Sequence, residues 1–362
     1  MAGSVVSPLG LTTEENFSKV SSGMSGLSRK SFNGFEACVG HIPNIMADET
    51  LTRFESLSIA ALKGLVKKVS IPTKRTLFIL STTKGNIEVL ENEQAEHPRL
   101  QLHAVAKMLA KEIGIDNHIV VSNACTSGVV ALITAKRYIE SGQVDHVVVL
   151  GADVLSQFVI SGFQSLNALS SATCKPFDTE RSGINLGEAA AAALLSGKPE
   201  MFDIKSNIAF LGGGISNDAN HISGPSKTGE ELADAIGLAL SEAQLRPEEI
   251  DFVSAHGTAT RYNDEMESKA FHLARLGSTP VHSLKGNFGH TLGAAGIVET
   301  LMAAQSLQEH TLLPTFGFDK IGVPHSLNIH KNKEQAELRN AVKTASGFGG
   351  CNAALVLTLE NK

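Results

Sequence analysis

The sequence predicts an α/β protein built from two halves, and three observations support this prediction. At 362 residues the chain is longer than one hydrophobic core usually organises, so two domains or two fused half-domains are expected. Amphipathic helical segments alternate with short strands rich in valine and isoleucine, a pattern typical of sheets covered by helices. No low-complexity stretch or long charged linker separates the halves, so we expect them to pack as one body.

The same helix-to-strand pattern occurs in two segments of the chain. Residues 131–153 read ALITAKRYIESGQVDHVVVLGAD, a helix that passes through a glycine break into a strand. Residues 231–258 read ELADAIGLALSEAQLRPEEIDFVSAHGT, in which Ile250 to Ser254 form a buried strand that leads to His256. Such alternation predicts parallel sheets with helices on their faces.

A boundary between the halves is expected near residue 200. The apolar run AAAAALL at 189–195 ends at Ser-Gly-Lys-Pro, and a strand-like segment, DIKSNIAFLGGG, follows it. Residues 1–200 are therefore assigned to an N-terminal half and residues 201–362 to a C-terminal half.

Composition excludes several classes of protein. No apolar run approaches the ~20 residues that a membrane span requires, and the N-terminal segment lacks the pattern of a secretory signal, so a cytoplasmic location is expected. A net charge of −6 without a basic cluster argues against a nucleic-acid partner. The four cysteines are too dispersed for a zinc site or a disulfide framework, so they are expected to be reduced thiols: Cys38, Cys125, Cys174 and Cys351.

Cys125 is the candidate nucleophile. In HIVVSNACTSGVVALITAKRYI (118–139) an apolar strand runs into Ser-Asn-Ala-Cys, and a helix begins within about two residues. Thr126 and Ser127 are good N-cap residues, and the positive end of a helix would favour thiolate over thiol. The other three cysteines are interpreted as small buried apolar residues.

Two histidines are candidates for activating the nucleophile and stabilising charge. His256 ends a strand in SAHGTAT, and His290 follows a strand in SLKGNFGHTLGAAG. Both lie beside glycine in the half opposite the cysteine, which favours a catalytic function over a structural one. Lys285, five residues before His290, is expected to orient a histidine electrostatically.

The last glycine-rich loop allows two interpretations. In TASGFGGCNAALVLTL (344–359) glycines surround Phe348 between two strand-like runs, which predicts either a simple hairpin turn or a backbone amide that stabilises an oxyanion. Glu267 and Glu299 are expected either to bind a metal or to support the site internally, although most acidic residues in helices are merely solvated.

Several motifs together resemble those of a known family. NACTSG, CKPFDTERSGINLGEAAA, AHGTAT with a following D..E, KGNFGHTLGAAG..E and GFGGCN occur in the order and approximate spacing of the β-ketoacyl-[acyl carrier protein] synthases. The resemblance is to an elongating ketosynthase and runs from VVSPLG (5–10) to the C-terminus. It implies the thiolase fold, in which two related α/β halves pack into a five-layered αβαβα core.

The resemblance also implies a reaction and a role for each candidate residue. Cys125 would receive an acyl chain from the phosphopantetheine of an acyl carrier protein and condense it with a malonyl-carrier thioester, which loses carbon dioxide. His256 and His290 match the pair that assists decarboxylation, and Lys285 matches the lysine that holds the second histidine in its working state. No cofactor and no metal would be required.

Further roles follow from the same resemblance. The amides of Cys125 and Phe348 would form the oxyanion hole, and the Phe348 side chain would gate the acyl pocket. Thr258 and Thr260 match hydroxyls that contact the pantetheine arm. Glu299 matches a structural carboxylate near the lysine, and Glu267 is assigned to structural support.

Departures from the family pattern leave alternatives open. The first strand is expected to be shortened or missing, and the segment from Thr83 to Cys125 is shorter than in typical members. Fatty acid, polyketide and polyene synthesis all stay possible, as do a homodimer and a heterodimer with a ketosynthase-like subunit. A thiolase-like acyltransferase that uses Cys351, a non-catalytic partner subunit and a regulatory binding protein are the alternative functions.

Overall fold

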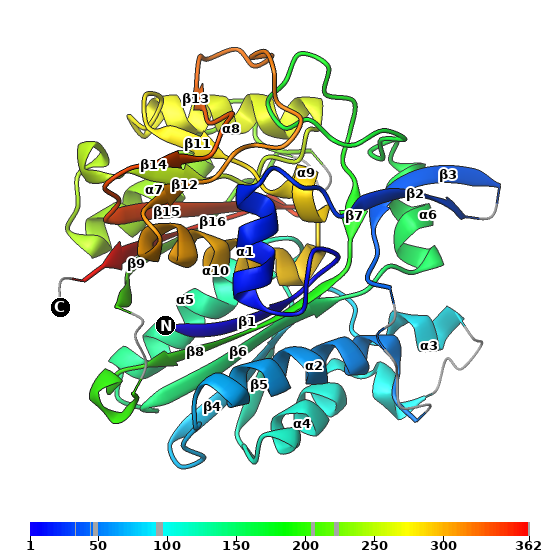
Figure 1. Cartoon of the computed structure of the whole chain (residues 1–362), viewed down its shortest axis with the longest axis vertical. Coiled ribbons are helices and arrows are strands. Elements are labelled where there is room, and N and C mark those ends of the chain that lie inside the picture. The colour runs from blue at the N-terminus through cyan, green and yellow to red at the C-terminus, as the bar shows by residue number, and fades with distance from the viewer. Residues whose placement is uncertain are drawn as a thin grey trace.

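Two large β-sheets, one from each half of the chain, frame the structure (Figure 1). The computed structural model describes residues 1–32, 34–43, 45, 50–91, 97–203, 207–220 and 224–360. The N-terminal sheet contains, in spatial order, β1 (Ala2–Val6), β8 (Ala189–Ser196), β6 (His146–Asp153), β4 (Thr76–Ser81) and β5 (His118–Val121). The C-terminal sheet contains β13 (Asn328–Ile329), β11 (Pro280–His282), β10 (Phe252–Ser254), β15 (Asn340–Gly347), β16 (Cys351–Leu359) and β9 (Ile208–Asn217).

The two sheets repeat one topology. If the strands of each half are numbered along the chain, with β13 set aside, both sheets follow the order third, second, fourth, fifth, first. The third, second and fourth strands are parallel in both, and the fifth runs antiparallel to the fourth and to the first. The expectation of two related halves is therefore confirmed, and the proposed division at residue 200 falls between β8 and β9.

The expectation of parallel sheets is wrong for the fifth strand of each sheet, which runs antiparallel to both of its neighbours. Between β15 and β16 the chain turns within three residues, so β16 must return antiparallel to β15. After β6 the chain leaves the sheet for residues 154–188 and re-enters it with β8 running opposite to β6. A strand is present at the start of the chain, because β1 pairs with β8 from Ala2 to Val6.

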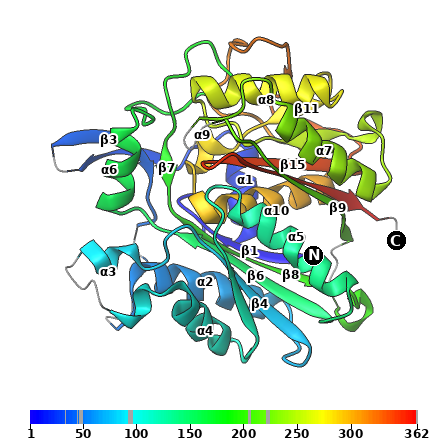
Figure 2. The same ribbon diagram turned by 180° about the vertical axis from the view of Figure 1, so that it is seen from behind.

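Helices form three layers around the two sheets, giving five layers in all (Figures 1 and 2). Helices α2 (Arg53–Lys68) and α4 (Leu102–Glu112) cover the outer face of the N-terminal sheet. Helices α7 (Glu230–Ala243) and α8 (Arg261–Leu273) cover the C-terminal sheet, while α5 (Ser127–Glu140) and α10 (Ala295–Gln308) lie between the sheets. This arrangement is the five-layered core of the thiolase-like fold.

Shorter elements complete the described chain. The remaining helices are α1 (Thr13–Ser21), α3 (Ile87–Glu91), α6 (Gln157–Ser165) and α9 (Lys285–Phe288), with 3-10 turns at Pro98–Leu100, Pro199–Met201, Pro247–Glu249 and Leu292–Ala294. Two small sheets are formed by β2 (Leu27–Phe32), β3 (Phe35–Gly40) and β7 (Leu186–Gly187), and by β12 (Thr311–Leu312) and β14 (Glu334–Gln335). Within the described ranges no helix is long and apolar enough to cross a bilayer.

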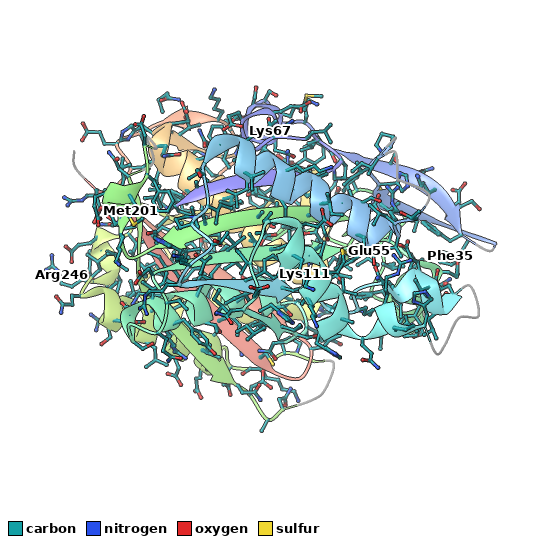
Figure 3. All side chains as sticks on the ribbon, turned by 90° about the horizontal axis from the view of Figure 1, so that it is seen from below. Phe35, Glu55, Lys67, Lys111, Met201 and Arg246 are labelled. Carbon is teal, nitrogen blue, oxygen red and sulfur yellow. The ribbon has the colours of Figure 1, made fainter. Side chains whose placement is uncertain are left out.

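Helix α2 shows how local sequence sets the ends of an element. Thr52 accepts a hydrogen bond from the Glu55 amide, and the Glu55 carboxylate accepts one from the Thr52 amide, which satisfies two free donors at the helix start. Lys67 and Lys68 lie in the last turn, where positive charge complements the helix dipole. Figure 3 shows Glu55 and Lys67 towards opposite ends of this helix, which runs across the outer face of the sheet.

The alanine-rich strand β8 is a case in which packing overrides helix propensity. Alanine is the best helix former, yet Ala189–Ser196 is extended between β1 and β6. Its odd-numbered alanines belong to the core shared with the inner helices, and Ala190 and Ala192 belong to the core under α2. Small side chains on both faces let helices approach this strand from both sides.

Helices α5 and α10 approach each other closely at a pair of glycines. A Cβ atom on Gly296 would lie 2.5 Å from the Val129 backbone nitrogen, and one on Gly128 would lie 2.9 Å from the Gly296 Cα. Such distances leave no space for any side chain, so glycine is required on both helices. This contact joins the two halves in the first turns of α5 and α10.

We therefore predict that Gly296→Ala lowers the free energy of unfolding by about 1–3 kcal/mol, because the added methyl group meets backbone that cannot yield. Gly237 on α7 is the matched control, since nothing lies within 4 Å of its added Cβ. Gly237→Ala should raise stability by about 0.5–1 kcal/mol, as expected for a helix interior. Urea unfolding of both variants measures the difference, and equal stability would contradict the packing argument.

Candidate active site

A pocket of about 490 Å³ opens between the two halves. Both halves contribute to it, and six of its lining residues were predicted from the sequence: Cys125, His256, Thr258, Thr260, His290 and Phe348. The structure thus brings together residues that lie more than two hundred positions apart in the chain.

Cys125 sits on a sharp turn between β5 and α5, as the sequence predicts. Ala124 adopts a left-handed backbone conformation with φ of 46°, which is unusual for a residue with a side chain and presents the next residue at the tip of the turn. The hydroxyls of Thr126 and Ser127 hold this turn, because they donate to the carbonyls of Asn123 and Ala124. Thr126 occupies the N-cap position, as predicted, but its side chain makes no capping bond to the helix.

The thiol of Cys125 is buried, which changes its expected ionisation. Burial raises the pKa of Cys125 to about 11, although the charges of Lys285 and Lys84 and the Phe348 amide act in the opposite direction. Desolvation therefore outweighs the positive helix end on which the prediction of a thiolate rested. In the free protein this residue is a thiol at neutral pH, and it must lose its proton when it attacks.

His256 and His290 face each other at the base of the pocket. Their ring centroids are 5.2 Å apart, with planes at 87°. Both side chains are buried, and within the described chain Nδ1 of His256 and both nitrogens of His290 have no hydrogen-bond partner. Burial, reinforced by the charge of Lys285, lowers the pKa of each imidazole well below its usual value, so both rings are neutral at pH near 7.

His290 is held by the other half of the protein. Its amide donates to the Asn185 carbonyl at 2.7 Å, and its carbonyl accepts from the Gly187 amide at 3.0 Å. The sequence predicted that His290 directly follows a strand. This is wrong, because the short helix α9 separates His290 from β11. Gly289 is required before it, since φ is 74° and a Cβ there would lie 2.6 Å from the Leu186 carbonyl oxygen.

Lys285 and Glu299 form a buried ion pair behind the histidines. The Lys285 ammonium binds the Glu299 carboxylate and donates to the His256 carbonyl at 3.0 Å. It was expected to hold His290, but the described chain shows no hydrogen bond from Lys285 to that ring, so it acts on His290 through its charge alone. A second buried ammonium, that of Lys343, lies 2.8 Å from the other oxygen of Glu299.

Glu267 fixes the backbone of the His256 loop. Its carboxylate accepts from the amides of His256 at 2.8 Å and Gly257 at 2.6 Å, and from the Asn263 side chain. Glu267 and Glu299 thus both bind donor groups of the protein itself. Of the two predicted alternatives, metal binding and internal support of the site, these contacts correspond to internal support. Within the described ranges no cluster of three or more histidine, cysteine or acidic side chains is arranged to hold a metal.

The glycine loop is both a hairpin turn and a wall of the pocket. Gly347 pairs with Cys351 at the end of the hairpin, and the chain passes so close to the nucleophile that a Cβ on Gly347 would lie 3.1 Å from the Cys125 nitrogen. The Phe348 backbone amide acts on the Cys125 sulfur, where it opposes the effect of burial on the pKa of the thiol. Its side chain is 38% exposed and stacks on Phe163 of α6, with ring centroids 5.8 Å apart.

Thr258 and Thr260 lie on the pocket wall with their hydroxyl oxygens 2.8 Å apart. The Thr258 amide donates to Asp264, a fully buried carboxyl whose pKa is raised by burial to about 7. Cys351, the alternative nucleophile, does not line the pocket; its sulfur donates to the Asn123 side chain at 3.0 Å.

Three residues near the site were missed or given no role at the sequence level. Lys343 interrupts the apolar strand AVKTASG, and a charged residue in such a run could have been noticed as a buried ion. Asp264 is part of the D..E pattern, but nothing in the sequence shows that its carboxyl is buried. Phe163 carries no local signal, because only the tertiary structure brings α6 to Phe348.

Comparisons with known proteins agree with this geometry. Residues 80–200 match the family model "Beta-ketoacyl synthase, N-terminal domain", and residues 209–319 match "Beta-ketoacyl synthase, C-terminal domain". A putative polyketide β-ketoacyl synthase 1 from Streptomyces virginiae is 32% identical over 76% of this chain and 69% of its own length. A 3-oxoacyl-[acyl-carrier-protein] synthase 2 from Mycobacterium leprae is 28% identical over 79% of this chain and 74% of its own.

Solved structures of ketosynthases have the same fold. One is a ketosynthase in complex with its chain length factor from Xenorhabdus doucetiae, with a TM-score of 0.87 and 29% identity over 99% of this chain and 97% of the other. The ishigamide ketosynthase/chain length factor gives a TM-score of 0.89 with 26% identity over 99% and 98%.

Duplicated α/β halves with a cysteine and two histidines in a shared pocket define an acyltransferase of the thiolase superfamily. Within that superfamily, the chain belongs to the β-ketoacyl synthase family.

The shared carboxylate gives a prediction for stability. Glu299→Gln should lower the free energy of unfolding by about 3–5 kcal/mol, because two buried ammonium groups lose their common counter-charge. Glu140→Gln is the matched control: Glu140 is exposed, and its partner Lys136 keeps Glu242 at 2.7 Å. The control should change stability by no more than about 0.5 kcal/mol. Chemical denaturation measures both, and similar losses would show that Glu299 is not an essential counter-ion.

Proposed function

We propose that this protein is an elongating β-ketoacyl-[acyl carrier protein] synthase in which Cys125 carries the growing acyl chain. The observation that carries the proposal is that a buried thiol and two neutral imidazoles line the same pocket. Those groups match the needs of decarboxylative condensation, which requires a nucleophile for acyl transfer and neutral donors for a transient enolate.

The first half-reaction is acyl transfer to Cys125. The sulfur attacks the thioester carbonyl of an acyl chain on phosphopantetheine, the new carbon–sulfur bond forms, and the pantetheine thiol leaves with the proton that Cys125 gives up. The tetrahedral oxyanion is stabilised by the amides of Cys125 and Phe348, which the close approach of Gly347 keeps together. Both donors are fixed before substrate binds, so little reorganisation is needed.

The second half-reaction uses the histidine pair. A malonyl-carrier thioester loses carbon dioxide, and negative charge develops on its thioester oxygen. Neutral His256 and His290 donate N–H groups to that oxygen; the unpartnered ring nitrogens are available for this. The enolate carbon then attacks the acyl carbon, the carbon–sulfur bond to Cys125 breaks, and the sulfur regains a proton.

Other residues are assigned to binding and positioning. Thr258 and Thr260 line the pocket wall, where their hydroxyls can bond the amides of a pantetheine arm. Phe348, stacked on Phe163, gates the acyl side. Lys285, Glu299 and Glu267 position the histidines from behind. The chemistry calls on no bound cofactor or metal, because the phosphopantetheine belongs to the substrate.

The proposal includes a carrier protein, a cytoplasmic location and a second subunit. Relatives support the carrier protein and the second subunit: one solved ketosynthase is described with its chain length factor, and another with an acyl-carrier protein. The subunit is either a second copy of this chain or a ketosynthase-like partner. The product belongs to fatty acid or polyketide synthesis, as the names of the curated relatives indicate.

Mass spectrometry tests the nucleophile directly. Incubation with acyl-carrier thioesters should add one acyl group at Cys125, and malonyl-carrier protein should then release a product longer by two carbons. Cys125→Ala should abolish both, because no other thiol lines the described pocket. Cys351→Ala is the control and should keep acylation. An adduct on Cys351, or condensation by Cys125→Ala, would disprove the assignment.

The histidines should separate the two half-reactions. His290→Ala removes an N–H donor for the enolate and should slow malonyl decarboxylation by about 100-fold or more, while Cys125 still becomes acylated. Rapid-quench measurement of acyl-enzyme and of released carbon dioxide follows each step. Equal loss of both steps would show that His290 acts on the nucleophile instead.

A further inference from the structure

Lys343 is a fully buried lysine on β15, inside the C-terminal sheet. It shares a strand face with Ala341 and Ala345, which belong to the core around the inner helices, so its side chain is directed towards α10. There its ammonium meets Glu299 at 2.8 Å.

The same ammonium also binds three backbone carbonyls. It lies 3.2 Å from the Ser254 oxygen and 3.3 Å from the Ala255 oxygen, and it contacts the carbonyl of Thr344 as well. Ser254 and Ala255 are the residues immediately before His256. Lys343 thus ties the backbone that carries one histidine to the carboxylate that binds Lys285.

Charged and titratable groups surround the histidine pair and come from several elements. They are Lys285 on α9, Lys343 on β15, Glu299 on α10, Glu267 and Asp264 on α8, Lys84 after β4 and the thiol of Cys125 before α5. The two lysines share one carboxylate, and Glu267 is occupied by the amides of the His256 loop. The charged side chains that lower the pKa of the two imidazoles are lysines: Lys285 and Lys343 act on both rings, and Lys84 acts on His290.

We propose that Lys343 is a second positioning residue for the condensation, which holds the His256 backbone in place and supplies positive charge that adds to the effect of burial in keeping both imidazoles neutral. The proposal rests on the proposed function of the pocket. Burial lowers the pKa of Lys343 while Glu299 raises it, and Lys343 in turn helps to lower the pKa of both histidines.

A neutral histidine pair protects the reaction intermediate. An imidazolium beside the enolate would protonate its carbon, turning the malonyl thioester plus one proton into an acetyl thioester and carbon dioxide, and no carbon–carbon bond would form. A neutral imidazole stabilises the oxygen and is too weak an acid to protonate the carbon readily. The ratio of acetyl-carrier to condensed product therefore reports the charge state of the pair.

An apolar residue would suit this position if only packing mattered. A buried ion is costly even when paired, and replacing buried ion pairs by apolar residues is often neutral or stabilising. The neighbours Ala341, Val342 and Ala345 are themselves apolar and fully buried. A lysine here is therefore better explained by its field at the histidines than by stability.

The test compares Lys343→Met and Lys343→Gln with the wild-type protein, using histidine labelled with carbon-13 at Cε1 and followed by NMR as pH is lowered. Removal of the cation should raise the pH at which His256 and His290 protonate by about one unit. The protonated fraction of the two imidazoles at a given pH then rises up to about tenfold. At about pH 6 both variants should therefore give a higher ratio of acetyl-carrier to condensed product than the wild-type protein.

Lys136→Met is the matched control, because Lys136 is also buried between two carboxylates but lies outside the pocket. It should leave the histidine titration and the product ratio unchanged. Because NMR titration needs no substrate, a wild-type protein without condensing activity would reject the proposed function but not the inference about charge.

Three results would overturn the inference. The first is a wild-type imidazole of the pair that protonates near pH 6.5. The second is a folded Lys343 variant with unchanged titration and product ratio. The third is the failure of both Lys343 variants to fold while Lys136→Met folds, since Lys343 would then be a structural residue.

Discussion

The contact between α5 and α10 is the constraint on which the rest of the structure depends. Gly128 and Gly296 let the two helices meet with no side chain between them, and this closeness sets the spacing of the sheets on either side. Cys125 precedes one helix, and His290 precedes the other by a short turn. If the helices stood farther apart, the thiol and the imidazoles would no longer share a pocket.

Desolvation dominates the chemistry of that pocket. It keeps the cysteine protonated and the histidines neutral. It also makes the electrostatic interactions between nearby groups stronger than they would be in water. The protein offsets the cost of burying Lys285 and Lys343 with Glu299 and with backbone carbonyls. The resulting site can stabilise negative charge on a substrate without any group that is itself strongly acidic.

Sequence patterns predicted the parts of the structure that are set locally or by shared motifs. The strand–turn–helix around Cys125, the strand leading to His256 and the two-half organisation all follow from periodicity and length, and the family resemblance implied the five-layered core. Strand direction in β8 was not predictable, because it depends on where a 35-residue excursion, 154–188, returns to the sheet. The thiol's ionisation and the role of Lys343 depend on burial, which a linear sequence does not display.

The repeated topology has a consequence for the chemistry of the pocket. In both halves a connecting segment joins the third strand to an inner helix, and the connection in the C-terminal half includes the short helix α9. Cys125 and His290 both lie in these segments, so they occupy corresponding places in the two repeats. A symmetric pair of identical chains would carry the same side chain at both places. Because both repeats lie in one chain, their sequences are free to differ, and one place carries a thiol while the other carries an imidazole. The pocket is therefore chemically asymmetric although the fold around it repeats.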